Sequence, residues 1–124
     1  MYEFEQISAG ELMAQLAQRL QSRRLEKGLS RQALSELSGV PAPTIARFEQ
    51  HHAISMRQYL DLAIALGYAE PLKELMREPI YKTMEELETI RQNKNRKRGS
   101  HTKRAKQIIE EMKSKIPNSK ITNP

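Results

Sequence analysis

An arginine on the outer face of a short helix is the residue best placed for recognition chemistry. Residues 29–48 read LSRQALSELSGVPAPTIARF, and the end of this stretch predicts a helix over about residues 43–50. At 100° per residue, Ile45 and Phe48 point to one side of that helix, and Pro43 and Arg47 point to the other. The Arg47 guanidinium can donate to both acceptors of a guanine in the major groove of DNA. A plain helical bundle with an exposed arginine is the alternative interpretation.

The second feature with a chemistry of its own is a basic block at residues 91–106. It holds eight Lys and Arg residues and no Asp or Glu: Arg91, Lys94, Arg96, Lys97, Arg98, Lys103, Arg104 and Lys106. The chain has a net charge of +6. Outside the block, however, there are 13 basic residues and 15 acidic ones, so the positive charge is concentrated in the block. Such a block binds polyanions such as DNA, RNA, an acidic protein or an anionic membrane. A solvated tail without a partner is the other interpretation.

The remaining residues offer little for catalysis, metal binding or stacking. The chain has no Cys and only three scattered His residues, and it shows no Gly-rich phosphate loop or cluster of paired carboxylates. We therefore expect no enzyme, no cofactor and no metal site. Trp is absent and aromatic residues make up 5% of the chain, which argues against a stacking platform for single strands. No apolar run approaches the roughly 18 residues of a membrane helix, and no secretory leader is evident, so we expect a cytoplasmic protein without a membrane partner.

Five helices are predicted to position Arg47. The first begins with a capping box of Ser8 and Glu11, carries Leu12, Leu16 and Leu20 on one face, and ends at Gly28. The second runs from the cap Ser30 to Gly39, with Leu34 and Leu37 inward. The third is the helix of Arg47. The fourth follows Ser55 and turns Tyr59, Leu62, Ala63 and Leu66 inward before Gly67. A short fifth helix holds Leu72, Leu75 and Met76.

The pattern changes after Pro79, so we expect an N-terminal domain at residues 1–78 and an extension at residues 79–124. Thr83 is expected to cap a helix with Met84, Leu87 and Ile90, which the basic block follows. A last short helix is predicted over residues 103–116, with Ile108, Ile109 and Met112 as its apolar side chains. Residues 117–124 are expected to be disordered. The fold class is all-α, because no hairpin signal interrupts the helical pattern.

The residues named so far resemble the Cro/C1-type (Xre-family) helix-turn-helix domain over roughly residues 12–76. The resemblance is carried by Gly28-Leu29-Ser30, Ala33-Leu34, Gly39-Val40, Thr44-Ile45, Phe48-Glu49 and Ala65-Leu66-Gly67. It implies a compact five-helix, lambda-repressor-like domain that binds double-stranded operator DNA as a homodimer. In such domains the third helix enters the major groove and the second crosses the backbone.

The resemblance also implies roles for single residues. Arg31 and Gln32 are expected to contact phosphate at the start of the second helix. Ala42, Pro43 and Arg47 fall at base-reading positions, and Thr44 falls where a hydroxyl meets the DNA backbone. Arg24 and Glu49 fall where the family keeps an ion pair between the first and third helices. The opening Pro41-Ala42-Pro43 departs from the family's polar residues and puts base reading largely on Arg47. His51 and His52 are expected in the loop that follows.

The extension resembles, more loosely, the antitoxins of the HipB type. The residues concerned are Pro79-Ile80-Tyr81, Met84-Glu85-Glu86-Leu87 and Arg96-Lys97-Arg98. This implies a repressor of its own operon that partners a HipA-like kinase toxin. A free-standing or phage-type regulator without a toxin stays open, as does an RNA-binding or protein-interaction module that uses the basic block. The operator sequence cannot be read from the chain.

Overall fold

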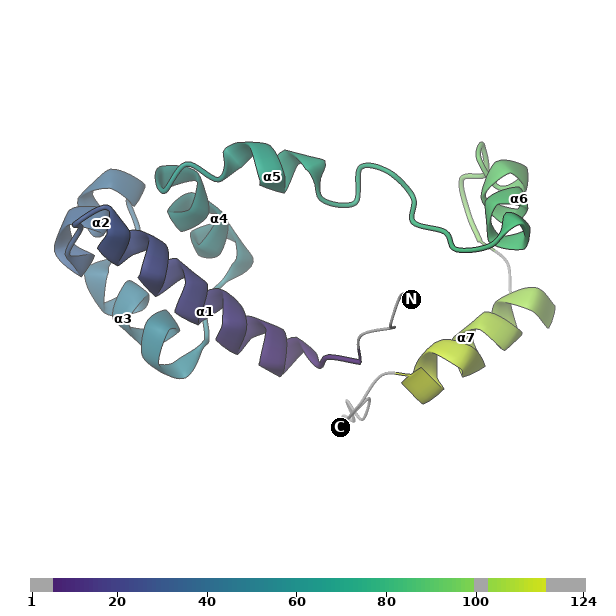
Figure 1. The fold of residues 1–124 in the computed structure, drawn as a ribbon, viewed down its shortest axis with the longest axis horizontal. Coiled ribbons are helices and arrows are strands. Elements are labelled where there is room, and N and C mark those ends of the chain that lie inside the picture. The colour runs from purple at the N-terminus through teal and green to yellow at the C-terminus, as the bar shows by residue number, and fades with distance from the viewer. Residues whose placement is uncertain (1–5, 100–102, 116–124) are drawn as a thin grey trace. The chain divides into compact units, whose positions relative to one another are not determined.

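The structure, a computed structural model, describes residues 6–99 and 103–115 (Figure 1). These residues form helices and no strand, which confirms the predicted all-α class. In chain order the helices are α1 (Ala9–Glu26), α2 (Arg31–Ser38), α3 (Ala42–His51), α4 (Met56–Ala65), α5 (Ala69–Glu74), α6 (Met84–Gln92) and α7 (Lys103–Lys115).

The chain divides into two compact units, Met1–Leu72 and Lys73–Pro124. The division falls within α5, so this helix belongs to both units by sequence. Every residue that is buried in the described part of the chain lies at or before Leu66, in the first unit. The first unit therefore carries the hydrophobic core, and the predicted domain boundary at residue 78 stays a prediction.

The first helix begins and ends on local signals. Ser8 Oγ accepts from the Glu11 amide at 3.1 Å, and Glu11 Oε1 accepts from the Ser8 amide at 3.1 Å, which completes the predicted capping box. At the other end Gly28 adopts a φ of 71°, which lets the chain leave the helix. Ala17, Leu20 and Arg24 are the buried side chains of α1.

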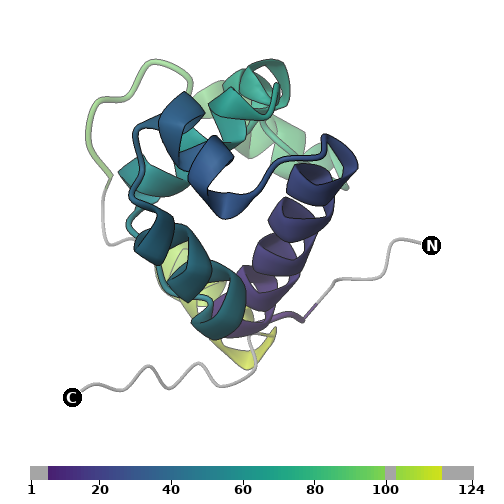
Figure 2. The ribbon, with the colours of Figure 1, turned by 90° about the vertical axis from the view of Figure 1, so that its left-hand side faces the viewer.

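The second and third helices are joined by a turn of three residues, 39–41, which can be followed in Figure 2. Gly39 adopts a φ of 81°, a left-handed conformation that a side chain would strain. Its amide donates to the Ser35 carbonyl at 2.8 Å, and the Val40 amide donates to Ser38 Oγ at 3.1 Å. Val40 is buried directly after the turn. The short connection thus brings α2 and α3 together, and α3 packs against both α1 and α2.

The core of the first unit is built from side chains of four helices and the turn. It contains Ala17, Leu20, Leu34, Val40, Ile45, Phe48, Leu62 and Leu66. The Phe48 ring lies edge-on to the Tyr59 ring, with the centroids 5.6 Å apart, so α3 and α4 meet through an aromatic pair. Burial raises the pKa of the Tyr59 hydroxyl, while the nearby Arg19 charge lowers it.

The predicted inward face of α2 is wrong at Leu37, and the predicted extent of the fifth helix is wrong at its end. Leu37 is 63% exposed, because α2 ends at Ser38 and the core place after the turn is filled by Val40. Leu75 and Met76 are exposed because α5 ends at Glu74, and Met76 turns into the left-handed region with a φ of 62°. The fifth helix is therefore shorter than predicted, and of the three residues that it was predicted to hold only Leu72, which is half-buried, lies in it.

The second unit has two amphipathic helices. Thr83 caps α6 as predicted, accepting from the Glu86 amide at 3.0 Å. Helix α7 begins at Lys103 as predicted and contains Ile108, Ile109 and Met112. The predicted disordered end at residues 117–124 lies outside the described residues. No helix in the described ranges is long and apolar enough to cross a membrane.

Candidate nucleic-acid interface

The first turn of α3 is formed around two prolines, Pro41 and Pro43. The helix begins at Ala42, one residue before the predicted start, and Pro43 is its second residue. The Thr44 and Ile45 amides both donate to the Pro41 carbonyl, at 2.9 and 3.1 Å, so the first turn closes on the backbone alone. Pro43 lacks an amide hydrogen at a position where helices have no partner for one. The first turn of α3 is thus well formed, although it offers few donors.

One face of α3 is buried and the opposite face is open. Ile45 and Phe48 have relative exposures of 0% and 1%, whereas Pro43 and Arg47 are exposed. Ala42 and Thr44 are half-buried beside them. The open face therefore presents the Pro43 ring and the Arg47 guanidinium, with the Ala42 methyl group and the Thr44 hydroxyl partly accessible beside them.

A shallow hollow of about 340 Å³ lies between α3 and the start of α4. It is lined by Thr44, Arg47, Ala53, Ile54, Ser55 and Gln58. Ser55 caps α4 by accepting from the Gln58 amide at 3.1 Å. The other first amides of α4 lack partners inside the helix, and the helix dipole makes this end positive. An anionic group beside Arg47 and Thr44 would meet donors from both helices.

A buried carboxylate holds α3 to α1. Glu49 has a side chain that is 1% exposed, and the Arg24 side chain is 6% exposed. Arg24 Nε donates to Glu49 Oε2 at 2.7 Å and Arg24 Nη2 donates to Oε1 at 3.0 Å. The third arginine nitrogen, Nη1, donates to the Leu29 carbonyl at 2.8 Å. The two charged groups thus pair with each other, and Arg24 also holds the backbone at Leu29, just before α2.

The same carboxylate also holds Arg31, a contact that sequence reasoning missed. Arg31 Nε donates to Glu49 Oε1 at 2.9 Å, and its side chain is 35% exposed. The first residue of α2 is therefore anchored to α3 while part of its guanidinium faces outward. The neighbouring Gln32 is exposed and donates to Glu36 Oε2 at 3.4 Å. No spacing within one helix encodes a contact between side chains of α2 and α3, so the sequence gives no signal for it.

The two histidines after Arg47 lie at the end of α3, and only the second lies beyond its last residue. His51 is the last residue of α3, and His52 ends the helix in the left-handed region with a φ of 63°. Both are exposed. The predicted loop placement is therefore wrong for His51, because α3 runs one residue past the predicted end at residue 50.

The basic block belongs to the second unit. Arg91 lies in α6 and pairs with Glu88 at 3.8 Å, and Lys94, Arg96, Lys97 and Arg98 follow in the segment after the helix. Lys103, Arg104 and Lys106 are on the first turns of α7. All are exposed except Arg104, which is half-buried. In residues 6–99 and 103–115, no group of histidine or acidic side chains is arranged to hold a metal ion.

Comparison with known proteins gives a family match for part of the first unit. The comparisons with curated proteins and with solved structures found no match. Residues 20–72 match a family model described as helix-turn-helix, HTH_3. The matched range begins within α1 and includes the Glu49 cluster, the turn at Gly39 and the open face of α3. Residues 20–72 therefore form a helix-turn-helix domain, which supports a DNA-binding transcription regulator of the Cro/C1 type.

Proposed function

We propose that the chain is a sequence-specific repressor whose helix α3 reads the major groove of operator DNA. The observation that carries the proposal is the exposed Arg47 on a helix whose opposite face, Ile45 and Phe48, is buried. A bidentate guanidinium–guanine contact is worth about 1–3 kcal/mol against a wrong base. Ala42 and Pro43 would contact a thymine methyl or fill space, since neither side chain can donate a hydrogen bond.

The phosphate contacts would surround this base contact. Arg31 and Gln32 start α2, and Thr44 lies at the hollow where α4 begins. Arg31 suits a phosphate because its side chain is partly exposed while Glu49 holds the guanidinium through Nε. Phosphate contacts set the register of a protein on the duplex and leave sequence reading to the groove. With one arginine reading bases, we expect much of the affinity to come from phosphates and DNA shape.

A single domain of this size with one base-reading arginine would specify a short site, so we propose that it acts as a homodimer. Two copies related by a twofold axis would place two α3 helices about one helical turn apart on a palindrome. DNase footprinting on selected duplexes tests the proposal. We expect protection of paired half-sites with that spacing. Protection of one isolated half-site by a monomer would contradict it.

The regulatory role that we propose is that of an autoregulating antitoxin with a HipA-like kinase toxin as partner. The support is the loose resemblance of the extension at Pro79-Ile80-Tyr81 and Met84-Glu85-Glu86-Leu87. In the structure Ile80 and Met84 are 90% and 71% exposed, so these side chains are accessible to a partner chain. The neighbouring gene is the direct check: a kinase-like reading frame whose product co-purifies with this chain supports the antitoxin role, and its absence favours a free-standing regulator.

A further inference from the structure

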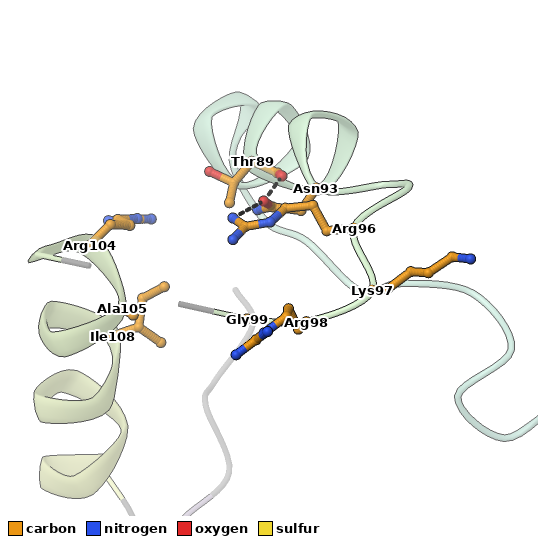
Figure 3. Close-up of a pocket in the computed structure, with 9 residues that line it drawn as sticks. All are labelled: Thr89, Asn93, Arg96, Lys97, Arg98, Gly99, Arg104, Ala105 and Ile108. Carbon is orange, nitrogen blue, oxygen red and sulfur yellow. Dashed lines mark hydrogen bonds between the residues drawn. The ribbon is translucent and has the colours of Figure 1, made fainter. Parts of the chain in front are cut away.

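The second unit contains a hollow of about 460 Å³ between the end of α6 and the start of α7 (Figure 3). Its size falls in the range of small-molecule sites. It is lined by Thr89, Asn93, Arg96, Lys97, Arg98, Gly99, Arg104, Ala105 and Ile108. Four of these nine residues are cations and none is acidic. In Figure 3, Arg96 and Arg98 point from the segment after α6 toward α7, whereas Lys97 points away.

One arginine of the hollow is held in place by a chain of hydrogen bonds. Asn93 Nδ2 donates to the Thr89 carbonyl at 2.9 Å, which fixes the amide group against the last turn of α6. Asn93 Oδ1 then accepts from Arg96 Nη1 at 3.0 Å. The Arg96 amide also donates to the Asn93 carbonyl at 3.1 Å. The Arg96 guanidinium is therefore oriented by neutral groups, and its charge is not neutralised by the contact.

The positive charge of the hollow is uncompensated in the part of the chain that the structure describes. There, no carboxylate forms an ion pair with Arg96, Arg98 or Arg104, although Arg91 in the same block pairs with Glu88. Several guanidinium groups around one hollow repel one another, and an anion between them removes that repulsion. The arrangement therefore favours a ligand with closely spaced negative charges.

We infer that this hollow is a phosphate-binding site formed by Arg96, Arg98 and Arg104. Guanidinium groups bind phosphate oxygens in a bidentate manner, and Asn93 presents one of them in a fixed orientation. The lining has no aromatic side chain on which a base could stack, so the ligand is recognised through its phosphates. The phosphates of a nucleic-acid backbone and those of a free polyphosphate share this chemistry. The site belongs to the second unit, whereas α3 belongs to the first.

The test uses the full chain and two probes, inorganic tripolyphosphate and a random-sequence DNA duplex, measured by titration calorimetry and fluorescence anisotropy. Arg96→Gln should weaken binding of a phosphate probe about tenfold, the value of a charged hydrogen bond. Asn93→Ala retains every charge and should weaken it by a smaller factor, because Arg96 loses its support. Lys94→Gln is the matched control: Lys94 carries the same charge two residues away but does not line the hollow.

The two probes separate the sources of phosphate. Tight binding of tripolyphosphate that Arg96→Gln weakens about tenfold and Lys94→Gln leaves unchanged assigns the site to free polyphosphates. A fall in DNA binding in Arg96→Gln, with an unchanged Lys94→Gln and no tripolyphosphate binding, assigns it to the nucleic-acid backbone. Equal effects of Arg96→Gln and Lys94→Gln on both probes would overturn the inference, because the block would then act as a uniform charged arm. Circular dichroism of each variant confirms that the helices remain intact.

Discussion

At the scale of single residues, Glu49 links three helices, because its buried carboxylate accepts from arginines of two other helices. Its contacts with Arg24 on α1 and Arg31 on α2 are all within 3.0 Å. A fully desolvated pair adds little stability by itself, since removing the two charges from water costs about as much as they regain. It does define how α3 sits against its neighbours. The residue that we expect to read bases, Arg47, is only two positions away on the same helix.

Glu49→Ala should lower the free energy of unfolding by about 3–5 kcal/mol, because Arg24 is left charged and buried without a partner. Denaturant unfolding followed by circular dichroism measures this. Glu26→Ala is the control: it removes the exposed Arg23–Glu26 pair and should change the free energy of unfolding far less, because solvent screens both charges. Similar destabilisation in the two variants would mean that the Glu49 cluster contributes no more than a surface ion pair.

Arg47→Ala should cost about 1–3 kcal/mol of binding to the operator and relax the preference at one base position per half-site. The reason is that Arg47 is the sole donor among the outward residues Pro43 and Arg47. Selection of binding sites from random duplexes, followed by affinity measurement, tests both parts. Arg77→Ala removes an equal charge outside the helix-turn-helix residues and should leave the base preference unchanged. An equal reduction on operator and random DNA would make Arg47 a phosphate contact instead.

Some of these contacts could be predicted from the sequence and one could not. The pairing of Arg24 with Glu49 followed from a family resemblance, and helical periodicity alone placed Arg47 opposite Ile45 and Phe48. The contact between Arg31 and Glu49 could not be derived in the same way. It depends on the distance between side chains of two helices, and no spacing within one helix encodes that distance.

At the scale of elements, the helix starts were predictable because their signals are local. Ser8, Ser30, Ser55 and Thr83 each cap the helix they were expected to cap, since the cap contacts an amide three residues away. Burial was less predictable. Leu34 and Leu37 share a helical face, yet only Leu34 is buried, because α2 ends one residue after Leu37 and Val40 occupies the core.

The turn between α2 and α3 depends on Gly39. Gly39→Ala should destabilise the domain by about 1–2 kcal/mol, because an L-residue is strained at the observed φ of 81°. A Cβ there would meet no atom within 4 Å, so a steric clash is not the cause. Gly10→Ala is the matched control with the opposite sign: in the first turn of α1 it should stabilise by up to about 1 kcal/mol. Thermal melts of both variants measure this, and destabilisation by Gly10→Ala would contradict the propensity argument.

At the scale of the whole molecule, the hydrophobic core and the basic block lie in different parts of the sequence. All the buried residues of the described chain lie at or before Leu66, while the basic block lies between residues 91 and 106. We therefore expect the first unit to fold without the block, and the block to act on the affinity of the whole chain without setting its base preference. Composition predicted this division, because charge and apolar periodicity can be read without knowing the packing.

Truncation after Asn93 tests what the block contributes. The truncated chain keeps the whole of α6. It lacks seven of the eight basic residues of the block and retains Arg91. If the block binds DNA, affinity for operator and random duplexes should fall alike, because phosphate contacts carry no sequence information. The slope of log affinity against log salt should flatten by about 0.9 for each phosphate that the truncated chain no longer neutralises.

The competing role for the same segment is a protein contact made by α7. Ile109 and Met112 are 40% and 52% exposed, and Ile108 is half-buried, so the helix carries an accessible apolar face. Under that role the truncated chain would bind DNA with an unchanged salt slope but would no longer retain its partner in co-purification. Affinities of the full and truncated chains at several salt concentrations separate the two roles. Electrostatic contacts respond to salt whereas apolar ones respond weakly, so an unchanged slope would exclude the block as a DNA-binding arm.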